Sequence, residues 1–157
     1  MTANESAAQK GELTLHRVLD APRKLVWRAW TQREQMMRWC APHGFAITHC
    51  ENDLRVGGAW RSCMCSPQGE NLWVGGEYRS IVEPETLVFT HVWDEADRPR
   101  HETLVTLNFA DENGKTRMTF RQQNFRSDES RDGHEGGWTQ SFARLNDFLG
   151  EMKKENA

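Results

Sequence analysis

The most restrictive feature of this sequence is an amphipathic segment near its C-terminal end that follows a long run of strand-like segments. Apolar residues from Trp138 to Met152 recur at spacings of four, three, four and three, with Phe142, Leu145 and Leu149 between them. This spacing places all of them on one face of a long helix. A helix with one apolar face must cover an apolar surface, and the strands before it offer that surface.

Six segments before this helix have the composition and the turn residues of strands. Their loops are short, which predicts an antiparallel sheet. Glycine pairs at 57–58 and 75–76 indicate bulges or close approaches of the backbone, and Gly114 suits a positive φ in a turn. The six segments are residues 45–53, 55–65, 71–82, 86–93, 101–109 and 115–125.

The N-terminal part of the chain predicts one more strand and two short helices. Residues 12–19 alternate between apolar and polar side chains, as a half-buried strand does. Pro22 suits the first turn of a helix, because the N–H that proline lacks has no partner there. The Thr-x-x-Glu spacing of a capping box at 31–34 predicts that the second helix begins at Thr31. We therefore expect an α+β fold in which the last helix covers the sheet.

Length and composition limit the classes of protein to consider. A chain of 157 residues suits a single domain, which we expect at residues 12–154, after a flexible polar tail of residues 1–11. This tail has the features of neither a signal peptide nor a membrane anchor. The formal net charge is -3 and the basic residues are scattered, so nucleic acid is not an expected partner.

Apolar runs in this chain are shorter than the roughly 20 residues that a membrane-spanning helix needs, so a membrane is not an expected partner either. We therefore expect a soluble, cytoplasmic protein. The four cysteines show no disulfide framework, and we expect them to be reduced thiols. They are Cys40, Cys50, Cys63 and Cys65.

Two groups of residues resemble metal sites, but their spacing argues against metal. His134-Glu135 could begin the His-Glu-x-x-His motif of zinc proteases, yet Trp138 stands where the second histidine is needed. We expect His134 and Glu135 to be solvated or to cap the helix. Cys63 and Cys65 share one face of a strand, whereas thiolate pairs that bind metal usually come from a turn. The sequence therefore predicts neither a metal nor a cofactor.

His91 is the histidine of greatest interest. By strand alternation it faces the same side as Phe89 and Trp93, so it points inward if they do. Two roles remain open for it: a hydrogen-bonded histidine of the core, or a group that contacts a ligand or substrate. Sequence motifs for a covalent hydrolase, a phosphate-binding loop or a dinucleotide site do not occur.

Aromatic residues exceed what a simple two-layer core requires, with seven tryptophans against one tyrosine. This excess predicts an aromatic-lined cavity, because ligand cavities are largely apolar with few polar groups. We expect the wall to consist of inward-facing residues that could contact a ligand, and we assign a catalytic role to none of them. Its members are Trp39, Phe45, Trp60, Phe89, His91, Trp93, Met118, Phe120, Trp138 and Phe142.

Four stretches together resemble a known family over nearly the whole chain from Leu13 to Leu149. They are APRKLVWRAWTQREQMMRWCAPHGF, DLRVGGAWRSCMCSPQG, GGEYRSIVEPETLVFTHVW and GGWTQSFARLNDFL. They resemble the START-like (SRPBCC) superfamily, in the family named after the activator of the heat-shock-protein-90 ATPase. The resemblance implies a helix-grip fold of the START and Bet v 1 type. In it a curved antiparallel sheet wraps around the long C-terminal helix, and two short helices follow strand one.

Three functions follow as hypotheses from this resemblance and from the residues. The first is a protein that binds a hydrophobic or aromatic small molecule in its cavity, and we favour this over an enzyme. The second is a cyclase- or hydrolase-like enzyme that uses His91 and an inward Arg or Glu in the same cavity. The third is an interaction module for a chaperone. A homodimer is compatible with each of them.

Overall fold

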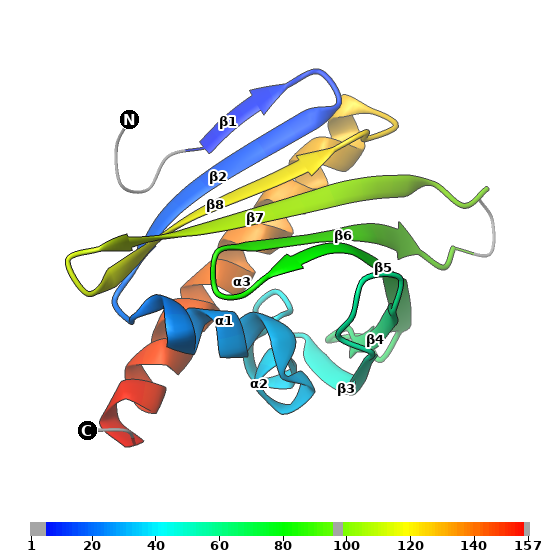
Figure 1. Cartoon of the computed structure of the whole chain (residues 1–157). Helices are drawn as coiled ribbons and strands as arrows, with labels where there is room; N and C mark the ends of the chain where they lie inside the picture. The colour runs from blue at the N-terminus through cyan, green and yellow to red at the C-terminus, as the bar shows by residue number, and fades with distance from the viewer. Residues whose placement is uncertain (1–5, 96–98, 156–157) are drawn as a thin grey trace.

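The structure is a computed structural model and describes residues 6–95 and 99–155. Eight antiparallel strands form one curved sheet in the order β1-β2-β8-β7-β6-β5-β4-β3. The sheet wraps around the long helix α3, and the short helices α1 and α2 lie at one end (Figure 1). This is the helix-grip arrangement that the resemblance implies. The elements are β1 (Ser6–Gln9), β2 (Glu12–Leu19), α1 (Arg23–Thr31), α2 (Arg33–Trp39), β3 (Ala46–Asn52), β4 (Ala59–Cys65), β5 (Asn71–Val82), β6 (Thr86–Trp93), β7 (Glu102–Glu112), β8 (Lys115–Gln123) and α3 (Asp128–Glu155).

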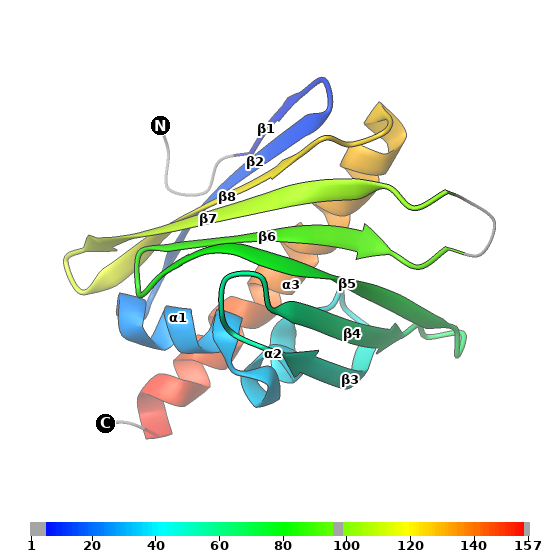
Figure 2. The same cartoon turned by 45° about the vertical axis from the view of Figure 1, so that its right-hand side comes forward.

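The short helices connect the two halves of the sheet. They come between β2 and β3 in the chain, although β3 lies at one edge of the sheet and β2 lies near the other. Figure 2 shows α1 and α2 beside α3, with α2 next to β3. Within the described residues no helix is both long and apolar enough to cross a membrane.

Strand β1 corrects the expected N-terminal tail. Residues Ser6–Gln9 pair with β2 in an antiparallel register that places Ser6 opposite Leu15 and Gln9 opposite Glu12. The flexible tail expected at residues 1–11 is therefore wrong from Ser6 onward, and residues 1–5 lie outside the described part. An edge strand is held by main-chain hydrogen bonds, so β1 needs no apolar alternation that the sequence could reveal.

Thr31 has a different role from the one that its spacing predicts. It is the last residue of α1, and its Oγ1 donates a hydrogen bond of 2.7 Å to the carbonyl oxygen of Trp27. Helix α2 begins at Arg33, and Gln32 precedes it without a side-chain capping bond. The predicted capping box is wrong, because the Thr31 hydroxyl already serves the preceding turn of helix.

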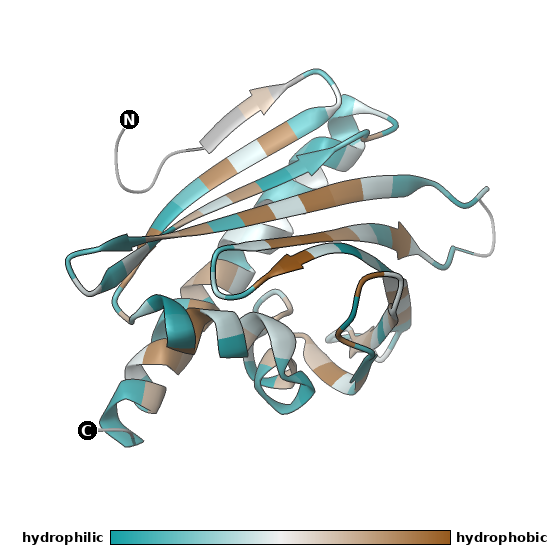
Figure 3. Ribbon diagram, viewed as in Figure 1, coloured by the Kyte–Doolittle hydropathy of each residue, from teal (hydrophilic) through white to brown (hydrophobic). Residues whose placement is uncertain are grey.

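The core lies where α3 and α1 pack on β2, β7 and β8. Figure 3 shows hydrophobic and hydrophilic residues alternating along β2 and β7, so that one face of each strand is apolar. The helix contributes the apolar stripe that its spacing predicts. Buried members of this core include Leu13, Leu15, Leu19, Leu107, Phe109, Met118, Phe120, Phe142, Leu145 and Leu149.

The hairpin between β7 and β8 follows its turn residues. Asn113 has a φ of 54° and Gly114 a φ of 84°, so both residues between the strands are left-handed. Two consecutive left-handed residues match the right-handed twist of the flanking strands. The positive φ expected at Gly114 is confirmed.

Gly76 of β5 allows Trp60 to lie across the sheet. The two residues are paired in register, and a Cβ on Gly76 would overlap the carbonyl oxygen of Thr90 in β6. The indole N–H of Trp60 donates to that same oxygen over 3.0 Å. The second glycine pair therefore marks a close approach, while the shift in register of β5 comes later, between Tyr78 and Ser80.

Gly76→Ala should lower the free energy of unfolding by about 1–3 kcal/mol, because the added methyl group meets main-chain atoms that cannot rotate away. Gly136→Ala in α3 is the matched control. Its Cβ would have no neighbour within 4 Å, so helix propensity alone should raise stability by up to about 1 kcal/mol. Urea unfolding of both variants measures the difference. Equal effects of the two substitutions would contradict the close approach at Gly76.

Candidate functional site

A cavity of about 460 Å³ lies between the sheet and the first half of α3. Pockets for small molecules in proteins span roughly 300–1,000 Å³, so this one is large enough for an organic ligand. Alternate residues of β4 and β6 face it, and α3 contributes residues three and four apart. The main wall residues are Trp60, Ser62, Met64, Leu72, Val74, Tyr78, Phe89, His91, Trp93, Ser130, His134, Gly137, Trp138 and Ser141, with Trp30, Met36, Cys40 and Phe45 at the end near α1 and α2.

The expected wall divides into two groups. Six of its members line the cavity: Phe45, Trp60, Phe89, His91, Trp93 and Trp138. The other four are at most 2% exposed and belong to the closed core: Trp39, Met118, Phe120 and Phe142.

For these four, the expectation of a cavity wall is wrong because other side chains cover them. The ring centroid of Phe120 is 4.8 Å from that of Trp138 and 5.3 Å from that of Phe142, so α3 packs directly on β8. Trp39 packs on Trp30 and donates a hydrogen bond of 2.9 Å to the carbonyl oxygen of Ala29. The empty space lies instead over β4, β5 and β6.

Aromatic rings surround His91 on the cavity wall. Its ring centroid lies 5.4 Å from Trp93, 5.8 Å from Trp60, 5.8 Å from His134 and 6.1 Å from Trp138. The residue is 5% exposed, and among the described residues its ring nitrogens have no hydrogen-bond partner. Burial, with a smaller effect of His134, lowers the pKa of His91 to about 3. The imidazole is therefore neutral at physiological pH.

His134 is a wall residue that the sequence pattern did not predict. Its Nδ1 lies 2.7 Å from the carbonyl oxygen of Ser130, and its Nε2 lies 2.9 Å from the indole nitrogen of Trp93. An indole N–H can only donate, so Nε2 accepts and Nδ1 carries the proton. Burial lowers the pKa of His134, and the hydrogen bond to Ser130 partly opposes this shift.

The expectation of a solvated or capping His134 is wrong, because the residue is half-buried and bonded to β6. One signal in the sequence could have revealed this position. His134 precedes Trp138 by four residues and therefore shares its face of the helix. Glu135, in contrast, is absent from the wall.

A buried chain of hydrogen bonds holds Trp138 and β6 in place. The indole of Trp138 donates to Oε1 of Gln122 over 2.9 Å, and Nε2 of Gln122 donates to Oγ1 of Thr103 over 2.9 Å. Thr103 donates in turn to the carbonyl oxygen of His91 over 3.1 Å. Gln122 is fully buried with both ends of its amide bonded, as a stable polar network requires. The position of Trp138 is thus coupled to the backbone of His91.

The inner wall carries no charge. Among the described residues that line the cavity there is no Lys or Arg, and its two carboxylates, Glu95 and Glu129, are exposed. Burial raises the pKa of Cys40 to about 12, that of Cys50 to about 11 and that of Tyr78 to about 12, so all three stay protonated. A ligand inside would therefore meet a neutral surface.

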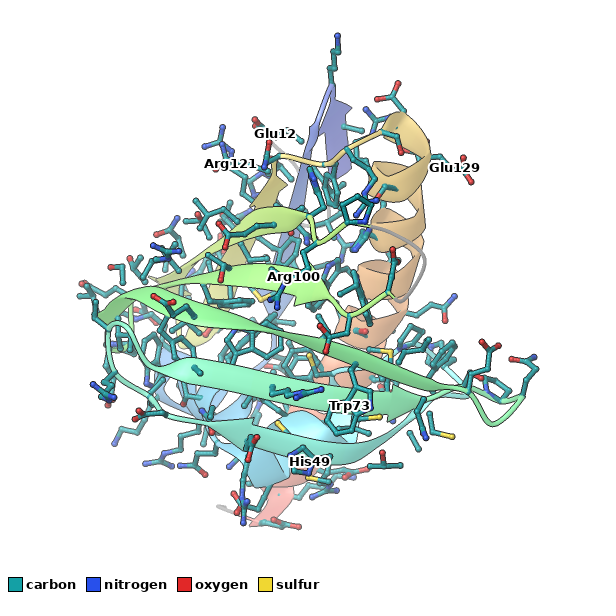
Figure 4. All side chains as sticks on the ribbon, turned by 90° about the vertical axis from the view of Figure 1, so that its right-hand side faces the viewer. Glu12, His49, Trp73, Arg100, Arg121 and Glu129 are labelled. Atoms are coloured by element: carbon teal, nitrogen blue, oxygen red, sulfur yellow. The ribbon has the colours of Figure 1, made fainter. Side chains whose placement is uncertain are left out.

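Cys63 and Cys65, the strand cysteines that resemble a metal site, lie away from the cavity. Figure 4 shows His49 and Trp73 together on the outer face of the sheet, with ring centroids 5.5 Å apart. Cys63 pairs with both of these residues in register, and Cys65 also stays off the cavity wall. Within residues 6–95 and 99–155, no three His, Cys, Asp or Glu side chains are grouped to hold a metal ion.

Comparisons with known proteins show the family of the chain and solved structures with the same fold. Residues 20–150 match the family model described as activator of Hsp90 ATPase homolog 1-like protein. A crystal structure of a protein from Chromobacterium violaceum is 28% identical, with a TM-score of 0.82, over 88% of this chain and 96% of that one. The AHSA1 protein from Silicibacter pomeroyi is 25% identical, with a TM-score of 0.80, over 90% of this chain and 99% of that one.

A third structure, from Arthrobacter aurescens, shares the fold at 22% identity. Its TM-score is 0.84, over 96% of this chain and 93% of that one. The search of curated proteins finds no match to the chain.

Proposed function

Since the chain belongs to the family of activator of Hsp90 ATPase homolog 1-like proteins, we propose that it binds a hydrophobic small molecule in the cavity between α3 and the sheet. The observation that carries this proposal is the cavity of about 460 Å³ with an aromatic, uncharged wall. Apolar surface of a ligand gains free energy when it leaves water for such a wall. Flat rings gain further from offset or edge contacts with the indoles.

The hydrogen bonds of the wall support a preformed site. Trp60, Trp93 and Trp138 each donate their indole N–H to a protein acceptor, so their rings keep their positions without a ligand. A rigid wall loses little conformational entropy when a ligand binds. Binding therefore requires no large rearrangement of β4, β6 or α3.

Acid–base catalysis in the same cavity has weaker support. An efficient general acid or base has a pKa near the working pH. His91 is a buried titratable group of the cavity, and its pKa of about 3 makes it a weak base at neutral pH. The inward Arg or Glu that an enzyme would pair with it is absent from the inner wall within the described residues. Binding is the function that this geometry favours.

A neutral fluorescent probe tests the proposed function. N-phenyl-1-naphthylamine should bind the protein and gain fluorescence, because the cavity excludes water from the probe. Ser62→Phe places a ring in the cavity from β4 and should abolish this signal. Glu77→Phe adds the same ring on an exposed residue of β5 and should leave the signal unchanged. A fluorescence titration measures both.

Two outcomes count against binding in the cavity. One is a natural protein that gives no rise in fluorescence. The other is an equal signal from Ser62→Phe and the natural protein, which would place the probe elsewhere on the surface. Circular dichroism of each variant checks that the fold is retained.

A further inference from the structure

We infer that the ligand is an uncharged aromatic molecule with a hydroxyl group, and that His91 binds this hydroxyl. The inference rests on the proposed function and names the chemical class of the ligand for that same cavity. Three observations carry it: an unpartnered imidazole, indole groups whose polar atoms are already bonded, and a wall without cations.

His91 is the first observation. Its ring is enclosed by Trp60, Trp93, His134 and Trp138, and its nitrogens lack partners among the described residues. Most buried polar groups of a protein are hydrogen-bonded, and an unpaired one is costly. The nitrogens of His91 are not among the fully covered atoms without a partner, so a group in the cavity can bond to them. A ligand that displaces water from it must offer a hydrogen bond in return.

The polar atoms near His91 are the second observation. The N–H groups of Trp60, Trp93 and Trp138 are bonded to Thr90, His134 and Gln122 respectively, all within the protein. Nε1 of Trp30 lacks a partner, but this atom is fully covered and out of reach. Among these ring side chains, His91 is thus the one that is both buried and open to a hydrogen bond from a ligand.

Charge is the third observation. A carboxylate or a phosphate loses its hydration when it enters an apolar cavity and needs a cation or several donors to replace it. Among the described residues that line the cavity there is no Lys or Arg, and His91 is neutral at physiological pH. A neutral imidazole presents one donor and one acceptor, and a hydroxyl group can pair with either. Hydroxyl therefore fits His91 where a carboxylate does not.

The shape of the enclosure favours a flat ring next to this hydroxyl. Trp60 and Trp138 have their ring centroids 5.8 Å and 6.1 Å from that of His91, and Phe89 lies 5.5 Å from Trp60. Aromatic pairs prefer such separations in tilted and edge-to-face contacts. A planar ligand can extend these contacts while its hydroxyl group reaches the imidazole.

Three probes of one ring size test the inference at pH 7.5: 2-naphthol, naphthalene and 2-naphthoate. Equilibrium dialysis measures the affinity of each for the natural protein. One hydrogen bond to a buried partner should make 2-naphthol bind about tenfold more tightly than naphthalene. The 2-naphthoate anion should bind at least about a hundredfold more weakly than 2-naphthol.

His91→Phe keeps a ring but removes both nitrogens, so it should bind 2-naphthol and naphthalene equally. His91→Gln keeps a donor and an acceptor and should retain a preference for 2-naphthol. His49→Phe changes a histidine on the outer face and should leave all affinities unchanged. The three affinities of the natural protein do not depend on whether a variant folds.

The outcomes separate the two proposals. Naphthalene binding without a preference for 2-naphthol overturns the role of His91 but leaves binding in the cavity standing. The role of His91 is also overturned if His91→Phe still binds 2-naphthol more tightly than naphthalene. It is overturned as well if 2-naphthoate binds as tightly as 2-naphthol. If these probes and N-phenyl-1-naphthylamine all fail to bind, the proposed function itself is wrong.

Discussion

Between pH 7.5 and pH 4, the free energy of unfolding of the natural protein should fall by about 3 kcal/mol more than that of a His91→Gln variant. The pKa of His91 falls from 6.5 to about 3 in the folded protein, so the unfolded chain binds more protons in this range. A lowered pKa of this kind contributes stability above pH 6.5 that is lost as the pH falls toward 3. Urea unfolding at a series of pH values measures the two slopes.

His134 adds to the same trend, because its pKa is also lowered by burial. Protonation at Nε2 would also remove the acceptor for the indole of Trp93. His49→Gln is the control, since this histidine is exposed on the outer face. Parallel slopes for the natural protein and His91→Gln would show that His91 is not held neutral by burial.

Phe120→Ala should lower the free energy of unfolding by about 3–5 kcal/mol, the usual cost of removing a fully enclosed phenylalanine. Phe120 is 0% exposed and packs against Trp138 and Phe142. Phe45→Ala removes the same atoms from a half-buried residue that already borders the cavity. Its cost should be less than half as large, because fewer contacts are lost. Urea unfolding at pH 7.5 measures both.

A larger loss of stability for Phe120→Ala than for Phe45→Ala would show that one phenylalanine belongs to the closed core and the other to the cavity wall. Both phenylalanines belong to the set that the sequence pattern assigned to the wall. Equal costs for the two variants would contradict the division between core and cavity that the structure shows.

Much of the fold could be read from local patterns. The predicted strands at 71–82 and 86–93 coincide with β5 and β6, and the apolar face from Trp138 to Met152 lies within α3. These elements were accessible because a half-buried strand alternates and a half-buried helix repeats every three to four residues. The errors at Thr31 and in β1 arose where a hydroxyl or an edge strand is stabilised by main-chain atoms alone.

The candidate site was harder to predict from the sequence than the fold. Phe120 was expected in the cavity wall and lies in the core, whereas His134 was expected in solvent and lies in the wall. Alternation in β8 indicates that Phe120 faces inward, but it does not reveal whether a helix or an empty space lies opposite. His134 sits beside two glycines and a glutamate, which made it look solvated, although it bonds to Trp93 on a strand far away in the chain. Both depend on the path of α3 across the sheet.

Local periodicity, turn glycines and residue composition were sufficient for the order of strands and helices from β2 onward, the long apolar helix face and the common face of Phe89, His91 and Trp93. These patterns reflect the backbone conformation of neighbouring residues, so each can be recognised within one short stretch of the chain. The division between core and cavity has another origin. It depends on the distance between α3 and each strand, which the packing of side chains from the whole chain sets together.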